Sequence, residues 1–255
     1  MSPQHLQDRV VVVLVRARNP GNIGAVARAM HDFGFRHLRV VNEYTVPFEE
    51  ARSAVDAAAI LGTAKSFSVF ADAIADCTLV VGTTAVGERA LEHPLHALPE
   101  AAEAIHNELA PEGARAALVF GSEKTGLSND ELSHCHSLLT IPMQLHEDLR
   151  HPSMNLGQAV AVCLYELVRC PGVCAGIGIR QAATADEVER FLKLFRDTLE
   201  ATGYTRRHPA NCSDAQLRRL VLRMGLSTVD VPVWIGILRQ FLWKIHHDDK
   251  PDPGV

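Results

Sequence analysis

Residues 19–28, NPGNIGAVAR, combine small residues with an arginine in a pattern that could bind a ligand. Gly21, Gly24, Ala25 and Arg28 recur at helical spacing, so they share one face of a predicted helix. That face would let a bulky partner approach the backbone, and the free amides at the helix start favour an anion such as a phosphate or a carboxylate. Tight packing against a neighbouring element explains the same pattern without a ligand.

Residues 118–127, LVFGSEKTGL, form a second candidate segment, in which an apolar run ends at Gly121 and a short polar turn follows. Gly121 would allow a ligand to lie close to the backbone. Glu123 could orient a ligand, and Lys124 could contact a phosphate. Ser128 with a glutamate three positions later predicts a capped helix directly after the turn. A plain strand–loop–helix connection is the alternative interpretation.

Residues 151–160, HPSMNLGQAV, form the third segment, where Ser153 is a possible cap and Asn155 lies in the first turn of a helix. Their side chains and the nearby amides could hold the edge of a ligand by hydrogen bonds. A capped helix with no ligand fits equally well. The short run Gly82–Ala85 has the same character, because an apolar stretch ends there in small polar residues.

These segments follow apolar runs that predict buried strands. We expect strands at 10–15, 38–41, 78–81, 116–120 and 138–141, and helices at about 23–33, 51–61, from 128, and 155–169. Strands that alternate with helices predict an α/β fold with a mostly parallel sheet. Ligands of such sheets bind beyond the carboxyl ends of the strands. The loops at 16–22, 82–89, 121–126 and 142–153 are therefore expected to form one site.

The rest of the chain predicts a second, smaller unit. Residues 170–183 are rich in glycine, alanine and cysteine and predict a linker. Apolar residues at helical spacing then predict a small helical domain over 184–246, and 247–255 is expected to be a frayed tail. No apolar stretch is long enough to cross a membrane, and no targeting signal precedes the first strand, so we expect a cytoplasmic protein.

Charge and cysteine usage narrow the classes further. The formal net charge is -5, which disfavours a generally nucleic-acid-binding surface, but arginines gather within residues 1–39 and 201–223. Such basic islands fit either local phosphate contacts or ordinary solvated helix faces. The six cysteines include no CxxC pair, so we expect reduced thiols and no structural metal site.

Taken together and in this order, the segments NPGNIGAVARAM, LVFGSEKTGLS and IPM…HPSMNLGQAVAV closely resemble the three motifs of the SPOUT methyltransferases of the TrmH type. FLKLFRDTLEATGYTRRHP and QLRRLVLRMGLSTVDVPVWIGILRQ are similar to the helical tail of tRNA 2'-O-methyltransferases within that class. The resemblance covers the chain from about residue 10 to residue 245. It implies a SPOUT domain over 1–169 with a C-terminal trefoil knot, a small C-terminal helical domain, and a homodimer.

The resemblance also implies the reaction and its residues. A methyl group would pass from S-adenosylmethionine to a ribose 2'-hydroxyl of tRNA, at the first nucleotide of the anticodon loop. The implied catalytic set is Arg28, Asn22, Glu123, Ser153 and Asn155. The implied cofactor-binding set is Thr83, Thr84, Ala85, Gly121, Ser122, Ile141, Pro152, Ser153 and Met154. Charge and family together suggest RNA contacts from Arg16, Arg18, Arg28, Lys124, Arg206, Arg207, Arg218 and Arg219.

One departure from the family pattern bears on RNA binding. Relatives often carry an arginine just after the segment that matches Gly82–Ala85, whereas Val86 and Gly87 stand here and Arg89 follows later. Three other functions stay open. They are an RNA-binding protein of this class without catalysis, a SPOUT enzyme that acts on rRNA or on a base, and a nucleotide-linked oxidoreductase. The last fits poorly, since the chain has no GxGxxG turn after its first strand.

Overall fold

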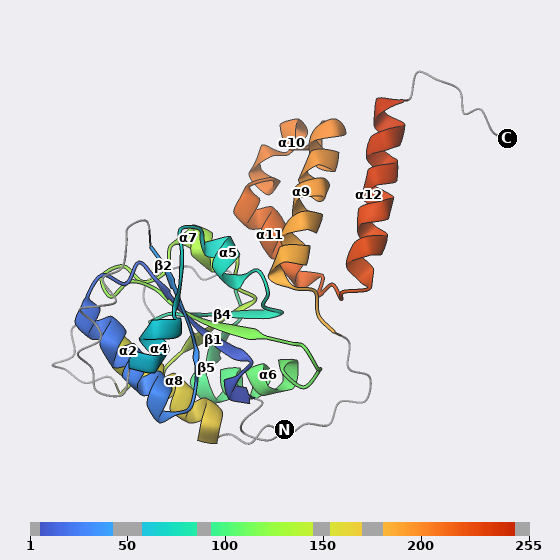
Figure 1. Ribbon diagram of the computed structural model, residues 1–255. Coiled ribbons are helices and arrows are strands. Elements are labelled where there is room, and N and C mark those ends of the chain that lie inside the picture. Colours follow the sequence, from blue (N-terminus) through green and yellow to red (C-terminus); the bar gives the residue numbers. More distant parts are fainter. Residues whose placement is uncertain (1–5, 43–57, 86–92, 145–153, 170–180, 248–255) are drawn as a thin grey trace.

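The structure is a computed structural model that describes residues 6–42, 58–85, 93–144, 154–169 and 181–247. Its centre is a sheet of seven parallel strands in the order β3-β2-β1-β6-β4-β7-β5 (Figure 1). The strands are β1 (Val10–Val15), β2 (His37–Val41), β3 (Lys65–Phe67), β4 (Leu79–Thr83), β5 (Leu95–Ala97), β6 (Ala116–Phe120) and β7 (Ser137–Thr140). The parallel α/β sheet that the sequence predicts is confirmed.

Helices cover both faces of this sheet, which explains why β1 is apolar along its whole length. Val10, Val12 and Leu14 join one buried cluster, and the alternate valines 11, 13 and 15 join the cluster on the other face. The first cluster packs under α2 (Pro20–Asp32), α4 (Ala58–Thr63), α6 (Leu98–Glu108) and α8 (Leu156–Arg169). The second packs under α5 (Phe70–Ile74) and α7 (Asn129–Ser133).

The start of α2 and its contact with α8 position the first candidate segment. Asn19 caps α2, because its side chain accepts a hydrogen bond from the amide of Gly21 at 2.9 Å. The small-residue face of α2 then packs against α8. A Cβ atom on Gly157 would lie only 2.6 Å from the Cβ of Ala25, so glycine is what allows the two helices to approach. Tight helix packing is thus one confirmed use of the small residues.

Four further helices follow the sheet domain within residues 181–247. They are α9 (Ala185–Ala201), α10 (Tyr204–Arg207), α11 (Asp214–Arg223) and α12 (Asp230–His246), with the 3-10 turn η1 (Pro209–Asn211). In Figure 1, α9 lies between α11 and α12, and its buried Phe191 and Leu192 belong to a separate apolar cluster. The amide of Ala185 donates to the carbonyl of Cys77 at 2.8 Å, so the first turn of α9 is attached to the sheet domain.

The structure differs from the predicted elements in a few places. Strands β3 and β5 and helices α5, α6 and α10 were not predicted, and all but α6 are five residues or shorter. Most of the predicted helix at 51–61 lies outside the described residues, as does most of the linker. Residues 181–183, predicted as its end, pair instead with residues 226–228. Among the described residues, no helix is long and apolar enough to cross a membrane.

Candidate functional site

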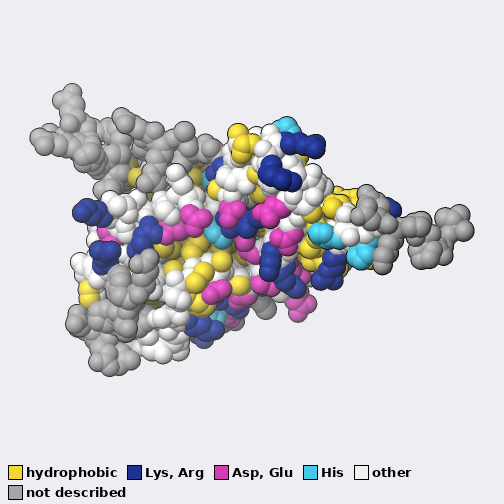
Figure 2. All heavy atoms as spheres, turned by 90° about the horizontal axis from the view of Figure 1, so that it is seen from above, with side chains coloured by type: hydrophobic (Ala, Val, Ile, Leu, Met, Phe, Trp, Pro, Cys, Tyr) yellow, Lys and Arg dark blue, Asp and Glu magenta, His cyan; other side chains and the backbone are white. Residues whose placement is uncertain are grey.

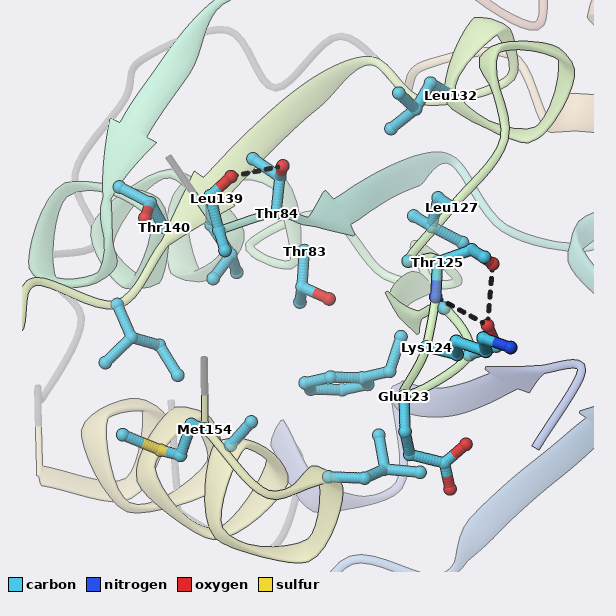
Figure 3. Close-up of a pocket in the computed structure, with 18 of the residues that line it drawn as sticks. Thr83, Thr84, Glu123, Lys124, Thr125, Leu127, Leu132, Leu139, Thr140 and Met154 are labelled. Carbon is cyan, nitrogen blue, oxygen red and sulfur yellow. Dashed lines mark hydrogen bonds between the residues drawn. The ribbon is translucent and has the colours of Figure 1, made fainter. Parts of the chain in front are cut away.

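A cavity of about 590 Å³ opens beyond the carboxyl ends of β4, β6 and β7 (Figure 3). The first turns of α8 also line this cavity. Seven residues of the predicted cofactor set line it, namely Thr83, Thr84, Ala85, Gly121, Ser122, Ile141 and Met154. The two remaining members, Pro152 and Ser153, lie outside the described residues. The structure therefore brings together in one cavity every predicted cofactor residue that it describes.

The loop after β6 is held tightly closed on itself. The amide of Gly126 donates to the carbonyl of Ser122 at 2.8 Å, and the Ser122 and Thr125 hydroxyls are 2.8 Å apart (Figure 3). Gly121 makes this closure possible, because a Cβ atom there would lie 2.2 Å from the carbonyl carbon of Gly126. Gly126 itself has φ +66°, a conformation that favours glycine. We call residues 121–126 the closed loop.

A chain of polar side chains joins the closed loop to α2 and α8. The Asn22 side-chain amide donates to Glu123 Oε1 at 2.8 Å, and the Asn155 amide donates to Asn22 Oδ1 at 3.1 Å. Asn155 in turn accepts from the amide of Gly157 at 2.9 Å, which caps α8. In Figure 3 the Glu123 carboxylate points away from the middle of the cavity. Three of the five predicted catalytic residues thus form one connected network.

Arg28, the predicted catalytic arginine, is exposed on α2. It lies one turn beyond Ala25, which contacts α8 at Gly157. Within the described part of the chain, its guanidinium has no hydrogen bond or ion pair, and it is not among the residues that line the cavity. Its charge is therefore available to an incoming anion. Ser153, the fifth member of the predicted catalytic set, lies outside the described residues.

The predicted RNA-contacting residues fall into two groups. Arg18, Lys124, Arg206 and Arg207 are exposed, and Arg219 is half-buried. Arg16 is instead half-buried, where it pairs with Glu131 and donates to the carbonyl of Gly126 at 2.9 Å. Figure 2 shows basic side chains scattered among acidic ones over the face that it presents, with no single basic surface there.

Arg218 differs from the prediction. Its residue is only 8% exposed, its Nε donates to Glu189 at 2.7 Å, and a second guanidinium nitrogen donates to Ser133 Oγ at 2.8 Å. A buried arginine that already has a carboxylate partner gains little from a phosphate. We therefore correct the prediction for Arg218, which joins α11 to the sheet domain through α7. The desolvation of neighbouring His134 lowers the pKa of that imidazole, so its ring stays largely neutral at this contact.

The chemistry of the cavity is that of a binding pocket. Behind it, burial raises the pKa of the Cys135 thiol to about 12, so this sulfur is no thiolate nucleophile near neutral pH. Among the described residues, no group of three or more His, Cys, Asp or Glu could hold a metal ion. The walls are mainly apolar and hydroxyl-bearing, and of the residues that the structure describes, Glu123 and Lys124 are the charged ones that line the cavity.

Sequence reasoning missed the apolar walls of this cavity. They are Phe120, Leu127, Leu132, Leu139, Leu156 and Ala159, and the hydroxyl-bearing Thr140 was missed with them. Thr125, Gly126 and Met143 also line the cavity, and they lie in loops that were predicted to form the site. A search for polar segments overlooks residues such as Phe120, because in the sequence the last apolar residue of a strand resembles any other core residue. Its position at the carboxyl end of a parallel strand is the signal that could have identified it.

The comparisons with known proteins agree with this geometry. A family model described as the SpoU rRNA Methylase family matches residues 9–165. The tRNA (cytidine/uridine-2'-O-)-methyltransferase TrmJ of Sodalis glossinidius is 36% identical over 94% of this chain and 92% of its own length. The tRNA (cytidine-2'-O-)-methyltransferase TrmJ of Methanocaldococcus jannaschii is 31% identical over 86% of this chain and 93% of its own length.

Solved structures show the same likeness. The crystal structure of TrmJ from Z. mobilis ZM4 superposes with a TM-score of 0.76 at 29% identity, covering 91% of this chain and 98% of that one. A probable methylase family protein from Haemophilus influenzae superposes with a TM-score of 0.57 at 28% identity, covering 94% and 98%. The strands, the closed loop and the described residues that line the cavity all lie within the matched residues 9–165, and the chain belongs to the SpoU rRNA methylase family.

Proposed function

We propose that this protein transfers a methyl group from S-adenosylmethionine to a ribose 2'-hydroxyl of tRNA. The observation that carries the proposal is the cavity at the strand ends, which is joined to α2 by the Glu123–Asn22–Asn155 network. The relatives named TrmJ, which are 31–36% identical over most of the chain, support tRNA as the substrate. The target nucleotide we propose is the first of the anticodon loop, as in the family that the motifs resemble.

The cavity fits the proposed methyl donor in size and in chemistry. Its volume of about 590 Å³ lies in the range of roughly 300–1,000 Å³ that is common for small-molecule sites. Apolar Phe120, Leu139 and Ile141 suit a flat adenine, and the turn at Thr83–Ala85 offers backbone groups and hydroxyls to its edges. Lys124 on the rim suits a carboxylate. When bound, S-adenosylmethionine supplies a methyl group that its positive sulfur already activates for transfer.

The protein's own residues then have to align the ribose and manage the hydroxyl proton. A guanidinium is protonated at every pH that proteins meet, so Arg28 is a poor general base. Its exposed charge suits a phosphate next to the target ribose. Arg28 would then position the hydroxyl, and the phosphate oxygen could take its proton. Asn155 caps the start of α8 and bonds to Asn22 on α2. These bonds hold α8, which lines the cavity, against α2, which carries Arg28.

We also propose the knotted, dimeric organisation that the motifs resemble. Strand β7 lies between β4 and β5, although β5 follows β4 directly in the sequence, and such a return is what a threaded C-terminal segment requires. Tyr165 and Val168 on α8 are 52% and 43% exposed and offer an apolar face to a second copy. Sedimentation analysis of a Tyr165→Glu variant tests the dimer, which should dissociate. The cytoplasm, where tRNA is modified, is the proposed location.

An rRNA substrate is the alternative that one observation favours, since the matching family model is described by rRNA methylation. One assay separates the two. The protein is incubated with labelled S-adenosylmethionine and either bulk tRNA or rRNA, and the modified nucleoside is mapped by mass spectrometry. A 2'-O-methylated cytidine or uridine in tRNA supports the proposal, and label in rRNA alone refutes the substrate. Cofactor binding without transfer to either RNA would identify a binding protein.

Arg28→Ala and Arg28→Lys test the role of the arginine in the same assay. If Arg28 positions a phosphate, alanine should lower turnover on the order of 100-fold, because misplacing a reacting group by about 1 Å costs roughly that factor. Lysine should recover part of the loss, since it keeps the charge but not the fork of donors. Cofactor affinity should stay unchanged in both variants. Near wild-type turnover with alanine would remove Arg28 from the reaction.

A further inference from the structure

Arg16 has an unusual backbone and an unusual side-chain position for a residue in a basic loop. It follows the last residue of β1, and its φ is +55°. Among the described residues other than glycine, it alone has a positive φ. Such backbone strain persists where surrounding contacts over-determine the conformation.

Its guanidinium reaches across to the closed loop. One nitrogen donates to the carbonyl of Gly126 at 2.9 Å, and another pairs with Glu131. Glu131 is also occupied by the start of α7, because its second oxygen accepts from the amide of Ser128 at 2.6 Å. Arg16 therefore contacts the last residue of the closed loop and the helix that follows it, from a strand more than 100 residues earlier in the chain.

Gly126 links the Arg16 side chain to the rest of the closed loop. Its amide bonds to Ser122, its carbonyl bonds to Arg16, and its backbone presses against Gly121. Ser122 and Gly121 line the cavity, whereas Arg16 does not. The arginine thus acts from outside the cavity, through its contacts with Gly126, which lines the cavity, and with Glu131, whose neighbour Leu132 lines it.

We propose that Arg16 is a positioning residue that holds the closed loop in the shape that binds the methyl donor. The proposal rests on the proposed function of the cavity. It replaces the expected RNA contact of Arg16, because a guanidinium shared between Gly126 and Glu131 is already paired within the chain. The left-handed backbone is what directs the side chain from the end of β1 across to the loop.

Calorimetric titration with S-adenosylmethionine tests this role in the full chain. Arg16→Gly is the main variant, since glycine adopts a φ of +55° without strain and leaves the backbone path intact. The dissociation constant should rise at least about tenfold, while tRNA affinity and its salt dependence stay unchanged. Arg16→Lys keeps the charge opposite Glu131 but lacks the fork of donors, so it should recover part of the affinity.

Two further variants make the result specific. Arg18→Gly alters an exposed arginine two positions away, and it should leave the cofactor dissociation constant unchanged and lower tRNA affinity. Glu131→Gln should weaken cofactor binding, and Arg16→Gly combined with Glu131→Gln should be little worse than Arg16→Gly alone, because both act through one contact. If Arg16→Gly fails to fold, Arg16→Lys and Glu131→Gln still test the contact.

The outcomes separate this proposal from the one on which it rests. A wild-type protein that does not bind S-adenosylmethionine overturns both. Wild-type binding with an unchanged dissociation constant in Arg16→Gly overturns only the positioning role. A loss confined to tRNA affinity, with a shallower salt dependence, would return Arg16 to the RNA-contacting set.

Discussion

Replacing Gly121 with alanine should impair the cavity while leaving the fold in place. The added Cβ would lie 2.2 Å from the carbonyl carbon of Gly126 and 2.3 Å from the amide nitrogen of Leu127. Ordinary contact begins near 3.4 Å, so the closed loop has to shift by about 1 Å. Both neighbours are backbone atoms, and no rotation of a side chain can relieve the clash.

The displacement of the closed loop should lower both the cofactor affinity and the stability of the protein by predictable amounts. Misplacing a reacting group by about 1 Å costs on the order of 100-fold in rate. Taking the same factor for the fit of the methyl donor, we expect its dissociation constant to rise about 100-fold, or about 2.7 kcal/mol. Overpacking typically costs about 1–3 kcal/mol of stability, which lowers the melting temperature of a chain of this size by roughly 2–12 °C. Calorimetric titration and thermal unfolding measure the two effects separately.

Two matched glycines serve as controls. Gly236 in α12 has open space around its Cβ position, so Gly236→Ala should leave cofactor binding unchanged and stabilise the helix slightly. Gly126 also has open space but a φ of +66°, so Gly126→Ala adds backbone strain without a clash. It should weaken binding less than Gly121→Ala. Wild-type cofactor affinity in Gly121→Ala would refute the reasoning, because the loop would then not shape the site.

Three other perturbations have defined outcomes. Asn22→Ala removes the link between Glu123 and α8, and it should lower turnover at least tenfold in the methyl-transfer assay with little change in melting temperature. Arg218→Ala removes the guanidinium hydrogen bonds to Glu189 and Ser133, and because the Glu189 carboxylate is partly solvated it should cost about 1.5–3 kcal/mol of unfolding free energy in chemical denaturation. Burial lowers the pKa of His136 to about 4 from its ordinary 6.5. Between these two pH values the unfolded chain binds a proton at this histidine and the folded chain does not. The free energy of unfolding should therefore fall by about 3 kcal/mol as pH drops from 6.5 to 4, and His136→Asn should flatten that fall.

The strands of the sheet were predictable because their signal is local. Five apolar runs identify β1, β2, β4, β6 and β7 to within a residue or two of their ends. The order in which they pair was not predictable from periodicity. Strand β6 lies beside β1 although about 100 residues separate them. Short strands such as β5, with three residues, carry too few side chains for a period to appear.

The parts of the site that are formed by backbone turns were predictable from the sequence. Glycine at a strand end followed by small polar residues marks the turns at Thr83 and Gly121, and both line the cavity. The motif resemblance added Ile141 and Met154, which no polar pattern marks. The polar network was predictable only as a set of residues, since the bond from Asn155 to Asn22 joins side chains 133 positions apart.

Counting charges along the sequence did not identify which arginines are available to RNA, because the carboxylate that pairs with an arginine can be distant in the sequence. Arg16 lies in a basic island of the sequence, yet it pairs with Glu131, which is 115 positions later. Arg218 looks like its neighbours on α11, yet Glu189 on another helix holds it. Whether a guanidinium is available to RNA depends on a carboxylate placed by the tertiary fold. A basic island therefore sets only an upper limit on the phosphate contacts of a surface, and the structure decides how many of its arginines are already paired.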